Sequence, residues 1–527
     1  MKHFQKQVQV LLAIVIIVSM LTACSGNTPT TTATSPVTTT QSAATTTATS
    51  STGIDNSEFV ELKMVMVGPE MDDYQRIIKI VNEKLKEDLN CSMKVEFLDW
   101  SEWATKYPLM FASGEDFDLC YASSWSGYVS QALKGAYMAL DLEEVQKYMP
   151  RTYENITSDM WNGTKVNDEI YMIPQTGLQF TGDHQLFMVR GDLMEKYSIT
   201  SIRNANDLIF YWEQVVANDT DLIPIAINRP WFGYWVTTAI LGGDPWLGMN
   251  YGNGPYQAYD LSDPNNVKTI SDDEWWAQNT RKLKLAQEFL ERGFWSKDAM
   301  SQVDEVRAMF TNGISATNIC ALVEANQIYE QVNAVHPEWK IQIVDINPNL
   351  PAVYYPITGD GTALHAKTKN TERAMQVLDI ISYDQAYYDL IYYGVEGQDY
   401  KLNTDGTFSW ISNPLNVGFR GMNNNITRLS TQAAPNFKEL LEHFKSIAFY
   451  PPMQSFNFIN TSVITEIAAV SDIEAKYDTV AHLGFIDGDV DAFVAEFRTA
   501  LEGAGLKTYQ DELGKQVQEY MTKYYGK

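Results

Sequence analysis

Hydrophobic and polar positions follow two different periods along the chain from about residue 58. The apolar run LKMVMV at 62–67 ends in Gly68-Pro69, which is typical of a buried strand. Apolar residues then recur at helical spacing from Tyr74 to Leu89, which predicts an amphipathic helix. Similar patterns predict a strand at 93–98, a helix at 103–111 and a strand at 117–121. Strands that alternate with helices favour an α/β fold with mainly parallel sheets flanked by helices.

Polar and aromatic residues follow each of these strands, at the sheet edge where open α/β folds bind ligands. They are Glu70 after the first strand, Asp99 and Trp100 after the second, and Ser124 and Trp125 after the third. We expect these side chains to contact a ligand. Asp99 fits equally well as a cap of the following helix, and Glu70 as a charge that complements a helix N-terminus.

The first 23 residues have the layout of a secretory signal. Lys2 and Lys6 precede an apolar run at 8–20, which is too short to cross a bilayer as a stable helix. The following sequence LTAC resembles a bacterial lipobox. That resemblance implies a signal peptide at 1–23 and a lipid on Cys24, which would hold the protein on the outer face of the bacterial cytoplasmic membrane. A plain secretory signal or an uncleaved anchor is the alternative.

A Thr-rich segment follows the cysteine. Between Asn27 and Gly53 the single large apolar residue is Val37. Such a segment cannot bury enough surface to offset the entropy lost on ordering. Residues 24–57 are therefore predicted to be a disordered tether between the lipid and the globular body.

Charge and reactive residues narrow the classes of function. The net charge is −27, which makes the protein a poor partner for nucleic acid. Beyond Cys24 there are three cysteines, an odd number that excludes a complete disulfide framework. The six histidines are scattered without metal-ligand spacing. The sequence contains no G-x-S-x-G and no glycine-rich phosphate loop. We therefore expect no metal, no cofactor and no enzymatic activity.

Aromatic residues point to a ligand with apolar faces and polar edges. The chain has 13 Trp and 29 Tyr, and a sugar site combines aromatic platforms with carboxylates, amides and arginine. Arg229, Trp231 and Trp235 lie in INRPWFGYW after an expected strand at 222–227. Other tryptophans lie inside expected helices and are predicted to pack instead: Trp103, Trp212, Trp275 and Trp276.

The order of several segments resembles the family 1 extracellular solute-binding proteins, the receptors of sugar ABC importers. The segments are ASGEDFD at 112–118, GAYMALD at 135–141, DEIYMIPQTG at 168–177 and GDGTALHAKTKNTERAMQVL at 359–378. YYGVEGQDYKLNTDG at 392–406 resembles a motif of the large lipoprotein branch of this family, whose last domain of unknown function resembles the C-terminal region here. Thr371 departs from the pattern, since the family usually has proline there.

The resemblance implies a two-lobed periplasmic-binding-protein-like fold with a hinge. It implies that the first lobe comprises 58–173 and about 318–378, and the second about 174–317 and 379–527, including the C-terminal helical region. It also adds ligand candidates: Glu324 at the return crossing, Phe456 and Phe458 in MQSFNF, and Tyr354 and Tyr355. Glu324 fits equally well as a partner of hinge amides.

The expected function is that of a lipid-anchored, monomeric receptor. It would capture a carbohydrate, in particular an oligosaccharide, and deliver it to the permease subunits of an ABC importer. Two alternatives stay open from the sequence. One is a cell-surface glycan hydrolase that uses two carboxylates, and the other is a receptor of the same fold for a peptide or another solute.

Overall fold

The first sheet forms where the hydrophobic pattern predicts it. β1 (Val60–Val67) runs parallel to β2 (Cys91–Leu98) and to β3 (Leu119–Ala122). β14 (Gly361–Leu364) runs antiparallel to β3 and to β6 (Ile173–Pro174), which gives the order β2-β1-β3-β14-β6. The structure is a computed structural model that describes residues 54–177, 184–244, 246–248, 258–260, 272–302, 304–412, 414–415, 419, 423, 425–450, 453 and 455–526.

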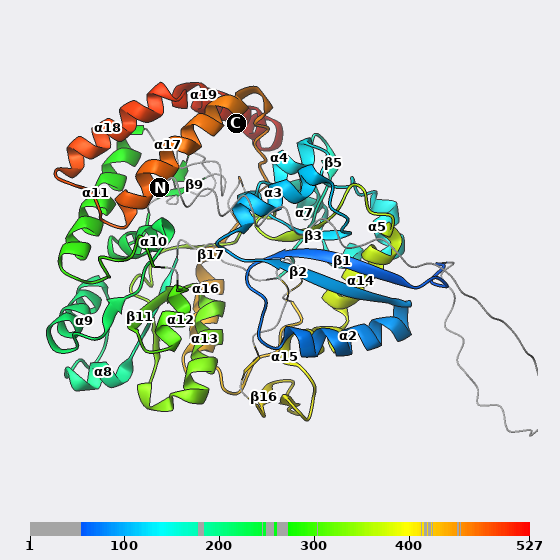
Figure 1. The fold of residues 1–527 in the computed structure, drawn as a ribbon, viewed down its shortest axis with the longest axis horizontal. Helices are drawn as coiled ribbons and strands as arrows, with labels where there is room; N and C mark the ends of the chain where they lie inside the picture. Colours follow the sequence, from blue (N-terminus) through cyan, green and yellow to red (C-terminus); the bar gives the residue numbers. More distant parts are fainter. Residues whose placement is uncertain are drawn as a thin grey trace, which may run out of the picture. The chain divides into compact units, whose positions relative to one another are not determined.

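Helices cover this sheet as the amphipathic pattern requires. α2 (Tyr74–Leu89) buries Tyr74, Ile77, Ile78, Val81 and Leu85 and packs against β2. α14 (Thr371–Tyr383) and α15 (Gln385–Tyr393) pack against α2, and Figure 1 shows the three helices beside β1 and β2. α3 (Trp103–Ser113) follows β2 and contacts it.

Both sheets were predicted to be mainly parallel, but both are mixed: the first has two parallel and two antiparallel pairings, and the second also combines the two kinds. The order of the second sheet is β12 (Gln342–Val344), β7 (Leu186–Val189), β11 (Ser315–Cys320) and β8 (Ile223–Ile225). β11 runs parallel to β8 but antiparallel to β7, and β12 is antiparallel to β7. β7 follows β6 of the first sheet closely in sequence. It therefore does not enter its own sheet through a βαβ crossover, the connection that would require it to run parallel.

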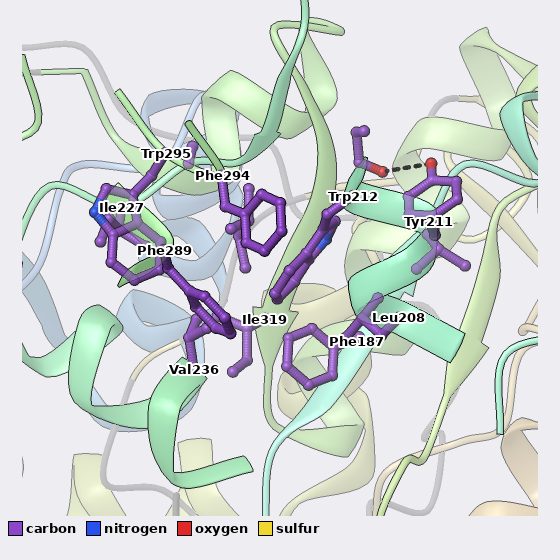
Figure 2. Close-up of a cluster of buried hydrophobic side chains, with 14 of the residues drawn as sticks. Phe187, Leu208, Tyr211, Trp212, Ile227, Val236, Phe289, Phe294, Trp295 and Ile319 are labelled. Atoms are coloured by element: carbon purple, nitrogen blue, oxygen red, sulfur yellow. Dashed lines mark hydrogen bonds between the residues drawn. The ribbon is translucent and has the colours of Figure 1, made fainter. Parts of the chain in front are cut away.

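An aromatic core packs against this second sheet (Figure 2). Trp212 of α9 (Ala205–Asn218) is fully buried and lies 5.8 Å from Phe289 and 5.5 Å from Phe294 between ring centroids. Its Nε1 donates to Thr317 Oγ1 at 3.0 Å, so the polar atom of this buried ring has a partner. The packing role predicted for Trp212 is confirmed.

The C-terminal helices form a further core. α17 (Ile464–His482), α18 (Val490–Gly503) and α19 (Leu506–Tyr525) pack with one another, and α11 (Asp272–Glu291) packs against α17 and α18 (Figure 1). α18 buries Val490, Val494, Phe497 and Leu501 on one face, as its hydrophobic pattern predicts. Trp276 is also buried in this core.

Short elements connect the sheets and helices. They are η1 (Ser124–Ser126), α4 (Tyr128–Leu133), α5 (Leu142–Tyr148), α6 (Pro150–Asn155), α7 (Ser158–Gly163), β4 (Lys165–Val166), β5 (Glu169–Ile170), α8 (Gly191–Lys196), α10 (Pro230–Ile240), β9 (Trp246–Gly248), β10 (Ala258–Asp260), α12 (Val306–Thr311), α13 (Leu322–Val335), η2 (Pro337–Trp339), β13 (Ala352–Val353), β15 (Tyr400–Leu402), β16 (Phe408–Trp410), α16 (Phe437–Ile447), β17 (Ala448–Phe449) and η3 (Thr461–Val463).

The lobe boundaries differ from the expected ones at two places. β11 and β12 belong to the second sheet, so the chain returns to the first sheet after residue 344 and not near 318. α15, expected in the second lobe, packs on α2 of the first, and Arg76 of α2 pairs with Asp399 at 2.9 Å. Every residue of β11 is buried, so this strand has no solvent-exposed face whose polar pattern would indicate its sheet from sequence.

The predicted signal peptide, Cys24 and the tether as far as residue 53 lie outside the described residues. Within the described ranges, no helix is both long and apolar enough to cross a membrane. The other three cysteines, Cys91, Cys120 and Cys320, are buried free thiols.

Candidate functional site

Two tryptophans that follow neighbouring parallel strands come together. The ring centroids of Trp100 and Trp125 lie 5.9 Å apart with an interplanar angle of 39°. Trp125 also packs edge-on against Trp103 at 5.2 Å and lies 5.4 Å from Tyr121. Trp100 and Trp125 are only half-buried, so the pair presents aromatic surface at the carboxyl edge of the first sheet.

Glycine at the end of β1 makes room for Trp100. Gly68 has a φ of +120°, a backbone conformation that L side chains rarely adopt. Its amide donates to the carbonyl of Leu98 at 2.8 Å, which joins the ends of β1 and β2. A Cβ at Gly68 would lie 3.6 Å from Trp100 Cζ2, so the indole lies directly against this turn.

The loop after β3 is held by the segment that precedes β14. Ser123 Oγ donates to the carbonyl of Gly359 at 2.5 Å, and the Ser124 amide donates to the carbonyl of Thr358 at 2.7 Å. Ser123 Oγ also accepts from the Trp125 amide at 3.2 Å. These bonds fix the backbone of Trp125. Ser124 Oγ is buried and has no hydrogen-bond partner among the residues that the structure describes, so its hydrogen-bonding capacity is unused.

A carboxylate and a guanidinium follow strands of the two sheets. Asp99 accepts from the amide of Ser101 at 2.9 Å and from its hydroxyl at 2.7 Å. These hydrogen bonds lower the pKa of Asp99, and the positive charge of Arg229 lowers it further. Asp99 follows β2, whereas Arg229 precedes α10 and donates Nη1 to the carbonyl of Asn228 at 2.9 Å. The charge of Arg229, in the segment after β8, therefore acts on Asp99 after β2.

Asp99 also organises the turn before α3. Its backbone carbonyl accepts from the amide of Trp103 at 2.9 Å, but its side chain bonds Ser101 ahead of the helix. The carboxylate remains exposed. The turn role and a ligand contact are therefore compatible for this residue.

α10 presents one face to solvent and the other to the core. Phe232 and Val236 are buried in the second core. Trp231 is 46% exposed and Trp235 is half-buried, packed edge-on against Phe232 at 5.3 Å. Trp231 is thus the aromatic residue of this helix with the most surface available to a ligand.

Four other candidates have partners within the protein. Glu70 is exposed and accepts from Gln75 Nε2 at 2.8 Å. Glu324 forms an ion pair with Arg307. Phe456 and Phe458 are buried in the C-terminal core against Tyr520 and Tyr509. The two phenylalanines therefore belong to a packed core, whereas Glu70 and Glu324 stay predicted ligand candidates beside the site defined by Trp100, Trp125, Asp99, Arg229 and Ser124.

Sequence reasoning missed two residues that shape the site. Tyr121 supports Trp125 and donates its hydroxyl to Asp360, which fixes the end of β3 against β14. Trp103, predicted only to pack, does so against the ligand-candidate ring of Trp125. Trp103 lies three residues after Trp100, and Tyr121 lies four residues before Trp125. This proximity in the sequence was the signal that could have indicated both residues.

The polar groups of the site do not form a metal centre. Within the described ranges no group of three or more His, Cys, Asp and Glu side chains is arranged to hold a metal ion. The site consists of aromatic rings, a hydroxyl, a carboxylate and a guanidinium, which suits recognition of a polar ligand with apolar faces.

Residues 68–382 match the family of bacterial extracellular solute-binding proteins, which is more than half of the chain. The chain belongs to this family. Residues 452–522 match a second family, DUF3502, a domain of unknown function. This solute-binding protein therefore joins a family core to a C-terminal domain that contains α17, α18 and most of α19.

Known relatives cover nearly the whole chain. A carbohydrate ABC transporter substrate-binding protein of Streptococcus pneumoniae is 23% identical over 497 residues, 90% of this chain and 93% of the relative. The N-glycan transport solute-binding protein NgtS of S. pneumoniae, solved with Man1GlcNAc, has a TM-score of 0.70 at 19% identity and covers 88% of this chain and 100% of its own. The alginate-binding protein AlgQ2 has a TM-score of 0.66 at 15% identity, with 88% and 98% covered. These structures confirm the predicted periplasmic-binding-protein-like fold.

Proposed function

We propose that this solute-binding protein is a lipid-anchored receptor that binds an oligosaccharide between its two lobes and delivers it to an ABC importer. The observation that carries the proposal is the half-exposed pair of Trp100 and Trp125, with Asp99 directly before Trp100 in the chain. The names of the relatives, a carbohydrate transporter receptor and an N-glycan receptor, support the same substrate class.

The chemistry of the site suits a sugar. Pyranose rings have apolar C–H faces that stack on indoles, and hydroxyl edges that need donors and acceptors. Asp99 accepts hydrogen bonds, Arg229 donates them and Ser124 Oγ can do both. Hinge closure around the ligand would then signal the loaded state to the permease.

A thermal-shift screen tests the substrate class. The chain without residues 1–23 and with Cys24→Ser is heated with monosaccharides, oligosaccharides and peptides. A ligand that binds the native state at about 100 times its Kd raises stability by about 2.7 kcal/mol. We expect a shift with an oligosaccharide class and recovery of that sugar intact. A shift with peptides alone, or cleavage of the sugar, would contradict the proposal.

Membrane retention tests the anchor. The proposed lipid on Cys24 and the Thr-rich tether would keep the receptor near the importer and raise its effective concentration there. We expect the full chain to sediment with membranes and Cys24→Ala to be released into the medium. Retention of the Cys24→Ala protein on the membrane would contradict lipid anchoring and leave the sugar-binding test unaffected.

A further inference from the structure

Two segments that are far apart in the sequence pair as short parallel strands beyond the second sheet. Ala352 and Val353 of β13 pair with Ala448 and Phe449 of β17. The pairing continues by one hydrogen bond, because the amide of Tyr354 donates to the carbonyl of Phe449 at 3.1 Å. The residues that follow the two strands, Tyr354 and Tyr450, are therefore held side by side.

The rings of these two tyrosines stack on each other. Their centroids are 4.2 Å apart and their planes are inclined by 21°. Tyr354 is half-buried, whereas Tyr450 is 60% exposed. One face of the Tyr450 ring is covered by Tyr354, so its exposed surface lies on the other face and the edges. A ring held in this way can stack on a ligand without first losing side-chain freedom.

The chain connects this pair directly to the tryptophan site. Tyr355 lies over Gly359, where a Cβ would meet its ring at 2.0 Å, and the Gly359 amide closes a turn by donating to the carbonyl of Pro356 at 2.7 Å. Thr358 then accepts from the Ser124 amide at 2.7 Å. Thr358 lies four residues after Tyr354, a distance of at most about 14 Å when the chain is fully extended. The turn shortens that distance further.

We infer that Tyr354 and Tyr450 form a second aromatic platform of the sugar site, one or more sugar rings away from Trp100 and Trp125. This inference rests on the proposed function and deepens it. Two separate platforms require a ligand with several rings, so the receptor selects chain length: the tryptophans take one part of an oligosaccharide and Tyr450 takes another. A monosaccharide occupies only one platform.

Calorimetric titration of variants tests the second platform. The probes are the monosaccharides, disaccharides and hexasaccharides of glucose, mannose and N-acetylglucosamine, titrated into the chain without residues 1–23 and with Cys24→Ser. For the sugar that binds, Tyr450→Ala should weaken the hexasaccharide by about tenfold and the shortest binding sugar by less than about twofold. Tyr450→Phe should bind like the unsubstituted protein, because the ring is retained.

A matched control separates the platform from general effects. Tyr524, on α19, is 56% exposed, close to the exposure of Tyr450, and Tyr524→Ala should leave binding unchanged. Because Tyr450 is exposed, Tyr450→Ala should melt like the parent without ligand. Unchanged hexasaccharide affinity in Tyr450→Ala, or an equal loss for short and long sugars, would overturn the inference while the proposed function stands. If the parent binds no sugar at all, both are overturned.

Discussion

Trp100 and Trp125 lie 5.9 Å apart between ring centroids although they follow different strands. β2 and β3 both run parallel to β1, so their carboxyl ends meet at the same edge of the sheet. Trp103 supports Trp125 from its edge at 5.2 Å. The result is an aromatic surface that the protein holds in place before any ligand arrives.

Ser124→Ala should separate binding from stability. Ser124 Oγ is buried without a hydrogen-bond partner in the described part of the chain, so its removal costs the folded state no hydrogen bond. We expect unfolding in urea to show no loss of stability, while sugar affinity measured by calorimetry falls several-fold. Ser126→Ala is the control: its Oγ donates to the carbonyl of Ser123 at 3.1 Å, so it should lose about 1 kcal/mol. An affinity unchanged by Ser124→Ala would exclude this hydroxyl from the site.

Lys282→Met should destabilise the protein strongly. Lys282 Nζ lies 2.7 Å from Asp244 Oδ2, and both side chains are almost fully buried, at 4% and 6% exposure. Removal of the lysine leaves a buried carboxylate without its cation, which costs about 3–5 kcal/mol. Lys284, two residues further along α11, pairs with Asp491 in solvent, so Lys284→Met should cost less than about 1 kcal/mol. Equal costs in urea unfolding would refute the role of the buried pair.

Gly233→Ala should disturb the contact between α10 and α17. A Cβ at Gly233 would lie 1.9 Å from the carbonyl oxygen of His482, so the two helices would have to move apart. We expect a loss of about 1–3 kcal/mol in unfolding free energy. A Cβ at Gly503, at the end of α18, would meet no atom within 4 Å, so Gly503→Ala should be neutral or stabilising by up to about 1 kcal/mol. A neutral Gly233→Ala would contradict the close approach.

Glu330 should make stability depend on pH. This side chain of α13 accepts from Trp410 Nε1 at 2.7 Å and from Asn326 Nδ2 at 2.8 Å. Burial raises the pKa of Glu330, and these two hydrogen bonds oppose that rise. The folded state therefore holds the proton more tightly than the unfolded state. The stability that this group contributes is present below its unfolded pKa and is lost as the pH rises through its folded pKa.

Glu330→Gln removes that titration. We expect the unfolding free energy of the parent, minus that of Glu330→Gln, to fall as the pH rises from about 4 to 7. Glu338→Gln is a control of opposite sign, because hydrogen bonds from its own backbone amide and from His336 lower the pKa of exposed Glu338. Its difference should rise between about pH 3 and pH 5, up to and through the unfolded pKa of glutamate. A constant or rising difference for Glu330→Gln would contradict the burial effect.

The first sheet was predictable because local pattern and final environment agree. The apolar run at 62–67 lies within β1, and the helical spacing from Tyr74 to Leu89 is the buried face of α2. The strand-end positions of Trp100 and Trp125 followed from the predicted strands at 93–98 and 117–121. What brings them together is parallel pairing with β1, which the alternation of strands and helices implies.

The sequence did not predict in the same way which strands belong to the second sheet. β11 has the sequence SATNIC and is entirely buried, because its polar side chains have partners such as Trp212 for Thr317. Two ligand candidates also have partners on other elements. Glu324 forms an ion pair with Arg307, and the ring of Phe458 packs against that of Tyr509. Neither contact is indicated by the sequence. An aromatic motif such as MQSFNF suits a helical core as well as a sugar site.

Sugar binding by the tryptophan pair can be measured on three proteins. The oligosaccharide found by the thermal-shift screen is titrated calorimetrically into the parent, Trp125→Ala and Trp339→Ala. Trp339 stacks on His336 at 4.1 Å, on η2, and serves as the control. We predict that Trp125→Ala weakens binding about tenfold to a hundredfold, while Trp339→Ala binds like the parent. Equal affinity of Trp125→Ala and the parent would contradict a sugar site at the tryptophan pair.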